Sequence, residues 1–342
     1  MRWPFSAARR KRKAASARPL PADMTRSYQP RIRRLEERRV LDVSAAFTSA
    51  TGQLDILISN SADTATLSVA NGQVVVTDSQ NQAVPIDVDG GGPASVNASH
   101  VNRIDARGDA AAGQIFQLDS PLLLPTGLTV ASSIERAELN GAITQVSGGD
   151  VLSDAVLTRL GADISTVDRE IRLGGDVELL ADVRLTGRNV ELVGQLNDDG
   201  QAGTSGSLQI YAHGLTRLGG DVGSTAALSR LTTDAAGWTE LGGDVQTARG
   251  EVEFADPVTL IRDVRISDMG GIGVRFGNTL DSRDGSFFGV RLETPSGRVA
   301  FVGDIGAGAM GDQRLGELIV EQAGDGVLFG DGGMSAVRVR GT

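Results

Sequence analysis

A five-residue motif, Leu-Gly-Gly-Asp-Val, recurs in this chain, and its aspartates are the residues that most invite a chemical interpretation. Full copies occupy residues 173–177, 218–222 and 241–245, and residues 148–151 repeat it without the leading Leu. Glycine and aspartate also form calcium-binding β-roll repeats, but those require Gly-Gly-x-Gly-x-Asp at about a nine-residue period. Here the second glycines lie at positions 149, 175, 220 and 243, so their spacing is far wider. The motif therefore predicts aspartates that cap turns, and Ca²⁺ would bind them only adventitiously.

Other candidates for catalysis or metal binding are few. The chain has no cysteine and two histidines, His100 and His213, which are too few for a His/Cys metal site and are expected on the surface or in turns. No Gly-x-Ser-x-Gly motif is present, so a Ser-His-Asp triad has no support. Residues 197–199 predict a polar turn, because Gly206 stands where a calcium-binding loop requires a bidentate Glu. We therefore assign no catalytic, cofactor-binding or metal-binding residue.

Composition weighs against an enzyme that cleaves polysaccharides. Such enzymes gather Asp, Lys or Arg, and often aromatic residues, in one groove. Lys11 and Lys13 are the only lysines, and aromatic residues make up 4% of the chain. A polysaccharide lyase or hydrolase is therefore the second hypothesis, behind a protein that does no chemistry. Asn97-Ala98-Ser99 fits a glycosylation sequon but identifies no partner.

Charge divides the chain near residue 43. Residues 1–43 carry 13 Lys/Arg and 4 Asp/Glu, a net charge of +9, whereas residues 44–342 carry 20 and 39, a net charge of −19. The basic run at residues 9–13 is not followed by the roughly 7–15 apolar residues of a secretion signal. No stretch reaches the roughly 18 apolar residues of a membrane-spanning helix. We predict a mostly disordered basic leader and an acidic body that does not bind nucleic acid.

The Leu-Gly-Gly-Asp-Val motif belongs to a longer pattern that predicts stacked strands. A short pattern begins with Ile, Val or Thr, has Leu or Phe two positions later, and then has Gly. It recurs at residues 171–175, 190–194, 216–220, 239–243, 274–277, 299–303 and 327–330. Residues 177–186 also resemble residues 258–267 in chemistry. A period of about 23 residues is typical of a solenoid, in which each turn of chain stacks on the one before.

These repeats predict an all-β solenoid over residues 44–342, clearest in residues 170–342. One turn per period would give about thirteen turns, spaced roughly 4.8 Å apart. Alternation along each strand should point Val and Leu inward and Arg, Thr and Glu outward. The Gly-Gly pairs are expected at corners, where glycine permits a positive φ.

Less regular segments also predict strands. Asn71-Gly72 is a strong two-residue turn signal between apolar, alternating segments, and it predicts either a hairpin or a pair of stacked strands. Residues 122–124 predict a buried strand. Residues 131–139 and 154–160 are compatible with a strand or a short helix, and we predict strands.

The segment Arg33-Arg34-Leu35-Glu36-Glu37-Arg38-Arg39-Val40-Leu41-Asp42 resembles the N-terminal Leu-Glu-Pro-Arg-x-Leu-Leu motif of large surface or exported proteins of planctomycetes. The similarity covers about eight residues, and Glu37 replaces the usual Pro. In that family the motif follows a basic segment and precedes repetitive β-rich sequence, as it does here. The resemblance implies export or association with the cell surface, by way of a non-standard leader.

Residues 217–247 and the strand that begins at Asp256 resemble repeats of filamentous-haemagglutinin-like and autotransporter-like adhesins. The shared features are Gly-x-Val-Gly, Ala-Leu-x-x-Leu-Thr-Thr-Asp-Ala, Gly-Gly-x-Val-x-Thr and a Val-Thr-Leu strand. This similarity covers about a third of the chain, and the remainder resembles these repeats only in its general character. The resemblance implies a right-handed parallel β-helix and a surface or secreted setting, with no particular ligand.

We therefore expect a non-enzymatic structural or adhesin-like protein, extracellular or on the cell surface, that presents loops on a rigid scaffold. Its partner would be a surface glycan or a protein. No cofactor and no transmembrane segment are expected. The strand pattern continues to residue 340 without an obvious polar cap, which allows end-to-end self-association or an origin as the first segment of a larger adhesin.

Overall fold

The computed structural model describes residues 42–109, 112–145, 148–201, 205–308, 312–330 and 337–338. The chain divides after Val40, and the fold described below is that of the second unit, Leu41–Thr342. The predicted leader, with its motif at residues 33–42, lies almost wholly outside the described residues.

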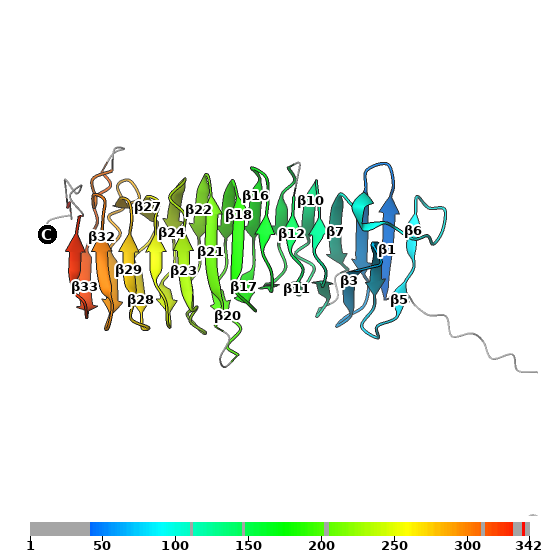
Figure 1. The fold of residues 1–342 in the computed structure, drawn as a ribbon, viewed down its shortest axis with the longest axis horizontal. Helices are drawn as coiled ribbons and strands as arrows, with labels where there is room; N and C mark the ends of the chain where they lie inside the picture. Colours follow the sequence, from blue (N-terminus) through cyan, green and yellow to red (C-terminus); the bar gives the residue numbers. More distant parts are fainter. Residues whose placement is uncertain are drawn as a thin grey trace, which may run out of the picture. The chain divides into compact units, whose positions relative to one another are not determined.

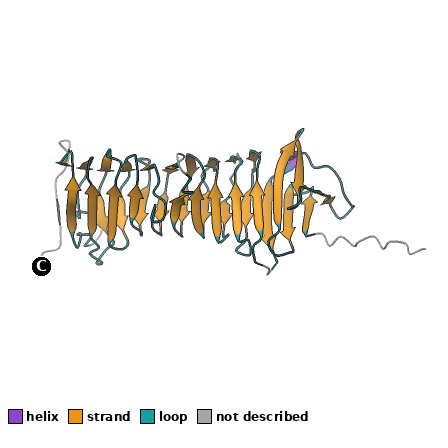
Figure 2. Ribbon diagram, turned by 90° about the horizontal axis from the view of Figure 1, so that it is seen from below, coloured by secondary structure: helices purple, strands orange, loops and turns teal. Residues whose placement is uncertain are grey.

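The second unit is a parallel β-solenoid, as the repeats predict (Figure 1). The chain visits three sheets in turn, so strands far apart in sequence become hydrogen-bonded neighbours. Figure 2 shows that strands account for nearly all of the regular structure, beside one 3₁₀ turn, η1 (Ala98–His100).

Sheet A contains β1 (Val43–Thr48), β2 (Gln53–Ile58), β6 (Ile86–Val88), β7 (Arg103–Gly108), β10 (Gly127–Val130), β13 (Val151–Ser153), β16 (Glu170–Leu173), β19 (Asn189–Leu192), β22 (Leu215–Leu218), β24 (Trp238–Leu241), β27 (Val258–Leu260) and β30 (Leu280–Ser282). Sheet C contains β9 (Leu122–Leu123), β12 (Ile143–Thr144), β15 (Ile164–Ser165), β18 (Val183–Gly187), β21 (Ser207–Ala212), β23 (Arg230–Thr233), β26 (Val252–Phe254), β29 (Gly273–Phe276), β32 (Arg298–Phe301) and β34 (Val327–Phe329).

Sheet B lies between them in chain order and has two parts joined by a bridge at Val222. The first part contains β3 (Thr64–Ala70), β4 (Gln73–Thr77), β5 (Ala83–Val84), β8 (Ile115–Leu118), β11 (Arg136–Leu139), β14 (Leu157–Leu160), β17 (Asp176–Leu179) and β20 (Leu196–Asp198). The second part contains β25 (Val245–Thr247), β28 (Val264–Asp268), β31 (Val290–Thr294) and β33 (Leu318–Ala323).

Eight described turns contain a strand of each sheet, the first being β7, β8 and β9. Two more turns replace one strand with a single bridging residue, Val222 or Ile305. Val190 pairs with Ile171 of the turn before it and with Thr216 of the turn after it. The first of these two steps along the chain is 19 residues and the second is 26 residues, so the length of a turn varies around the predicted period of about 23 residues. The estimate of thirteen turns is wrong, because the residues before β7 do not form turns.

Those earlier residues, 43–100, form an antiparallel cap. β1 pairs antiparallel with β2, β3 with β4, and β4 with β5, while β6 joins β1 in parallel. The predicted Asn71-Gly72 turn links β3 and β4, and its φ angles of 54° and 76° are those of a hairpin turn of type I′. On their other edges, β2 pairs in parallel with β7 and β3 pairs in parallel with β8, so the first turn of the solenoid stacks directly on the cap.

Inward side chains form columns of like residues. In sheet A, one buried column is Leu173, Leu192, Leu218, Leu241 and Leu260. This confirms the predicted inward Leu of the repeat. Because each Leu lies over another Leu, every turn offers the next one the same apolar surface.

A second column contains aromatic rings. Phe254, Phe276, Phe301 and Phe329 stack with centroid separations of 5.7, 5.4 and 5.3 Å. These residues lie in sheet C, whereas the Leu column lies in sheet A, so the Leu and Phe forms of the repeated pattern belong to different sheets. Both sheets need the same alternation of inward apolar residues, so the pattern identifies a strand without identifying its sheet.

The similarity between residues 177–186 and 258–267 has the same explanation. The first segment runs from sheet B into sheet C, through β17 and β18, whereas the second runs from sheet A into sheet B, through β27 and β28. The two segments are therefore alike in sequence, but they occupy different pairs of sheets.

The less regular predictions hold in part. β11 and β14 lie within residues 131–139 and 154–160 and confirm strands there. Residues 122–124 contain β9, in which Leu122 is buried but Leu123 is 50% exposed. That segment is half-buried and alternating, because its outer side chain faces solvent.

Candidate functional site

The three full Leu-Gly-Gly-Asp-Val copies form one corner of the stack. Each begins at the end of a strand of sheet A and leads toward sheet B. The long gap between the first two full copies holds two turns, and Gly194 takes the place of the missing second glycine between them. A Cβ at Gly220 would meet the carbonyl of Gly194, and a Cβ at Gly243 would meet that of Gly220.

These contacts correct the expected role of the glycines. None of the six glycines in the full copies has a positive φ. Glycine is needed at Gly175, Gly220 and Gly243 because the backbone of the previous turn lies where a side chain would begin. The corner is a column of close backbone contacts.

The aspartates of the motif cap this corner, as predicted, but they act on the following turn. Asp176 Oδ1 accepts a hydrogen bond from the backbone N–H of Gln195 at 2.9 Å. Asp221 Oδ1 accepts one from Asp244 N at 2.9 Å, and Asp244 Oδ1 accepts one from Arg265 N at 2.9 Å. These carboxylates join successive turns, which accounts for their presence without a metal ion.

The shortened copy at residues 148–151 belongs to a different corner and therefore not to this series. It precedes β13 and so leads from sheet C to sheet A. Gly148 has a φ of +94°, and Asp150 Oδ1 accepts a hydrogen bond from Glu170 N of the next turn at 3.1 Å. The same local chemistry is reused where the chain turns between other sheets.

Both histidines are exposed and lie in turns, as predicted: His100 ends η1, and His213 follows β21. The described residues contain no group of three or more His, Cys, Asp or Glu side chains arranged to hold a metal ion. The polar turn predicted at residues 197–199 is wrong at its first two positions. Asn197 and Asp198 are buried in β20, where Asp198 Oδ1 accepts a hydrogen bond from Gly206 N at 2.7 Å.

Two adjoining hollows lie beside sheet B. They measure about 330 and 370 Å³ and share Asp244 and Arg265. Arg265 forms ion pairs with Glu293 and, at 3.1 Å, with Glu321. Carboxylate and guanidinium groups thus line the hollows, and they are already paired with one another or with the backbone.

A third hollow, of about 240 Å³, lies where sheet B meets sheet C. Its lining includes Asp163, Asp182, Arg184 and Gln209. Arg184 Nη2 donates a hydrogen bond to Gln209 Oε1 at 3.1 Å, and the guanidinium carbon lies 5.1 Å from the centroid of the Tyr211 ring. One of its lining residues, Arg184, thus also packs on an exposed aromatic ring.

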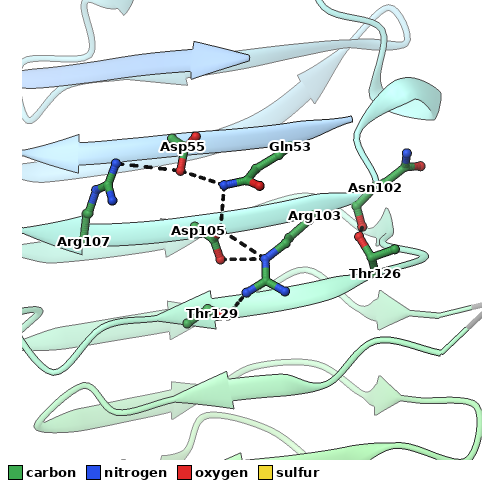
Figure 3. A network of polar contacts seen from close by, with 8 residues as sticks. All are labelled: Gln53, Asp55, Asn102, Arg103, Asp105, Arg107, Thr126 and Thr129. Atoms are coloured by element: carbon green, nitrogen blue, oxygen red, sulfur yellow. Dashed lines mark hydrogen bonds and ion pairs between the residues drawn. The ribbon is translucent and has the colours of Figure 1, made fainter. Parts of the chain in front are cut away.

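A polar network on the outer face of sheet A lies where the cap meets the first turns (Figure 3). Gln53 Nε2 donates hydrogen bonds to Asp55 at 3.0 Å and to Asp105 at 2.9 Å. Arg103 donates to Asp105 at 2.9 Å and to Thr129 Oγ1 at 2.8 Å. The network spans β2, β7 and β10, so it fastens the cap to the solenoid.

One buried carboxyl group has an altered acidity. Asp256, at the corner between β26 and β27, is 1% exposed and accepts hydrogen bonds from Thr233 Oγ1 at 2.7 Å and Thr239 Oγ1 at 2.8 Å. Burial raises the pKa of Asp256 to about 6, because removal from water disfavours the charged form more than the two hydroxyl groups favour it. The group faces the interior, where a ligand has no access.

Comparison with known proteins identifies no relative. No family model, no curated protein and no solved structure matches this chain. Among the described residues, no helix is long and apolar enough to cross a membrane.

Proposed function

We propose that the protein is a non-enzymatic structural or adhesin-like protein of the cell surface or the secreted fraction, and that the solenoid displays its outer faces and loops to a partner. The observation that carries the proposal is the engagement of the corner carboxylates. Asp176, Asp221 and Asp244 each accept a backbone hydrogen bond from the next turn. The most repeated polar residues therefore hold the scaffold together.

Rigidity supports a display role. Most strands of the turns are hydrogen-bonded to strands of the turns before and after them, and sheet C continues this pairing over ten strands. A ligand that binds such a surface meets side chains that are already held in position, which lowers the entropy lost on binding.

Localisation is tested by fractionating cells with an antibody to the protein, together with protease treatment of intact cells. The proposal predicts that the protein is in the medium, or is cleaved on intact cells while a cytoplasmic marker survives. Recovery of the intact protein only with the cytoplasmic marker would contradict it.

End-to-end self-association belongs to the same proposal. In β34, Val327, Leu328 and Phe329 are 41%, 41% and 50% exposed, and Phe329 presents the far side of the Phe column. Light scattering should show mass increasing with concentration, and Phe329→Asp should abolish the increase. A mass that stays constant for the wild-type protein would contradict this part of the proposal.

Polysaccharide cleavage is a second candidate, supported by the hollows beside sheet B, which carboxylate and guanidinium groups line. The carboxylates of Asp221 and Asp244 are occupied by backbone N–H groups, and Glu293 is paired with Arg265. General acid–base catalysis needs a carboxyl group that reaches the substrate. Release of reducing or unsaturated sugar ends from a polysaccharide panel, lost in Glu293→Gln, would establish this candidate over the first.

A further inference from the structure

Two aromatic side chains face solvent on either side of one corner. Tyr211 is the last but one residue of β21 in sheet C and is 39% exposed, and Trp238 begins β24 in sheet A and is 46% exposed. They are the one Tyr and the one Trp within the described residues. Each strand also supplies inward residues to the core, so the interior does not require an aromatic ring at these outward positions.

The fold brings these two rings to neighbouring turns. Trp238 pairs in register with Leu215, and Leu215 follows Tyr211 by four residues around the corner. The Trp238 backbone N–H donates to Gly214 O at 3.0 Å, which fixes its strand against the corner below. The path from Gln209 to Leu215 spans six residues, so the surface is at most about 20 Å long.

Hydrogen-bonding groups adjoin the rings. Arg184 lies over the Tyr211 ring and donates to Gln209, and both polar residues line the hollow of about 240 Å³. Beyond Tyr211, exposed His213 lies at the corner beside Asp234, whose Oδ1 accepts a hydrogen bond from Ala212 N at 3.1 Å. Polar groups thus lie on both sides of the Tyr211 ring.

This combination matches the chemistry of a sugar chain. A pyranose ring has an apolar C–H face, which packs on the electron-rich face of an aromatic ring, and a rim of hydroxyl groups that pair with guanidinium, amide and carboxylate groups. The carboxylates of Asp163, Asp182 and Asp234 lie near this surface, and so do the guanidinium groups of Arg184 and of Arg188, which is beside Gly214 at the corner. Charges of both signs give the surface no excess positive charge to favour sulfated or uronic acid chains.

We propose that Arg184, Gln209, Tyr211, His213 and Trp238 form a binding surface for a neutral oligosaccharide that crosses the corner between sheets C and A. The proposal rests on the display function above, and it names the chemical class of the partner to which the solenoid displays this surface. It is a binding site only: no bond is made or broken there.

Tryptophan fluorescence provides a direct readout, because the chain contains only Trp3 and Trp238. Titration of the full chain with neutral gluco-, manno- and galacto-oligosaccharides should change the emission of the wild-type protein and of Trp3→Phe, and should leave Trp238→Phe unchanged. Calorimetry should show affinity at least tenfold weaker in Trp238→Ala and Tyr211→Ala.

Matched controls are Ile272→Ala and Met269→Ala, which remove exposed apolar side chains, 59% and 53% exposed, away from this surface. Both should bind as the wild type does, and thermal melting should show that all variants fold. The conservative Tyr211→Phe should retain most of the affinity, because the ring supplies the contact.

Three results would overturn the proposed site: the wild-type protein binds no neutral oligosaccharide, the Trp238→Ala and Tyr211→Ala variants bind as tightly as the wild type, or the protein binds sulfated chains alone. None of them bears on the cell fractionation result. A surface-located protein with no sugar binding would refute this site alone, and a cytoplasmic protein that binds sugars in vitro would refute the surface function alone.

Discussion

Inside the stacked turns, like residues lie over like, whereas several positions on the outer faces place opposite charges over one another. In the interior, Phe276 lies between Phe254 and Phe301. On the outer face of sheet A, Arg217 lies between Glu191 and Glu240. The interior must match shape at every turn, while the exterior needs only local charge balance, so variation between turns is tolerated mainly outside.

The largest predicted effect breaks the interior. Phe276→Ala leaves a cavity in the middle of the Phe column and should lower the free energy of unfolding by about 4 kcal/mol. Urea unfolding followed by circular dichroism measures it. Leu328→Ala is the matched control on the outward side of β34, and it should cost less than about 1 kcal/mol. Equal losses would show that the two sides are not distinct.

Gly220→Ala tests the corner column. Its new methyl group would meet the backbone of Gly194, and we expect a loss of about 2–3 kcal/mol, because the neighbouring turn must move. Gly91→Ala is the milder comparison, since Gly91 lies in an exposed loop of the cap without a positive φ and its new Cβ would meet only the Val88 carbonyl, at 3.3 Å. It should cost less than about 1 kcal/mol. A neutral Gly220→Ala would refute the close backbone approach.

Asp256 makes one part of the interior sensitive to pH. Its folded-state pKa of about 6 exceeds the ordinary value of 3.8, so folding favours the protonated form. The contribution of this group to stability is complete below about pH 4 and is lost as the pH rises through about 6. Asp256→Asn removes this dependence on pH. The free energy of unfolding of the variant minus that of the wild type should therefore be about 2 kcal/mol larger at pH 7.5 than at pH 4. Melting temperatures across this range measure the difference, and parallel curves for the two proteins would contradict it.

The outer ladder should yield the smallest effect. Arg217 and Glu240 form an ion pair at 2.6 Å in a partly exposed setting, so their coupling energy should be below about 1 kcal/mol and should decrease with salt. A double-mutant cycle with Arg217→Ala and Glu240→Ala measures it. A coupling energy as large as the loss in Phe276→Ala, and insensitive to salt, would show that the outer face contributes as much as the interior.

Particular residues show how far sequence reasoning reaches. The inward Leu of each repeat and the tight turn at Asn71-Gly72 were predictable, because strand alternation and turn chemistry are local. The sheet that holds Phe276 was not, because three sheets impose the same alternation on every strand. The cap was missed because antiparallel pairing of β1 and β2 depends on contacts that a period analysis does not contain.

The candidate binding surface was also missed, for a physical reason. Tyr211 and Trp238 lie more than one turn apart along the chain, and only the stacking of β24 on β22 brings them to neighbouring turns. The available signal was their rarity: an aromatic ring at an outward position of a chain that has few aromatic residues.

Cross-linking tests the stacking of turns most directly, because the chain has no cysteine of its own. Glu191 and Arg217 are register partners in adjacent turns, whereas Glu191 and Glu240 are two turns apart. Neighbouring strands lie about 4.8 Å apart, within the reach of a disulfide, and two strand spacings exceed it. On mild oxidation, a Glu191→Cys/Arg217→Cys variant should form an intramolecular disulfide and Glu191→Cys/Glu240→Cys should not. The reverse result, or no cross-link in either variant, would contradict the stacked register.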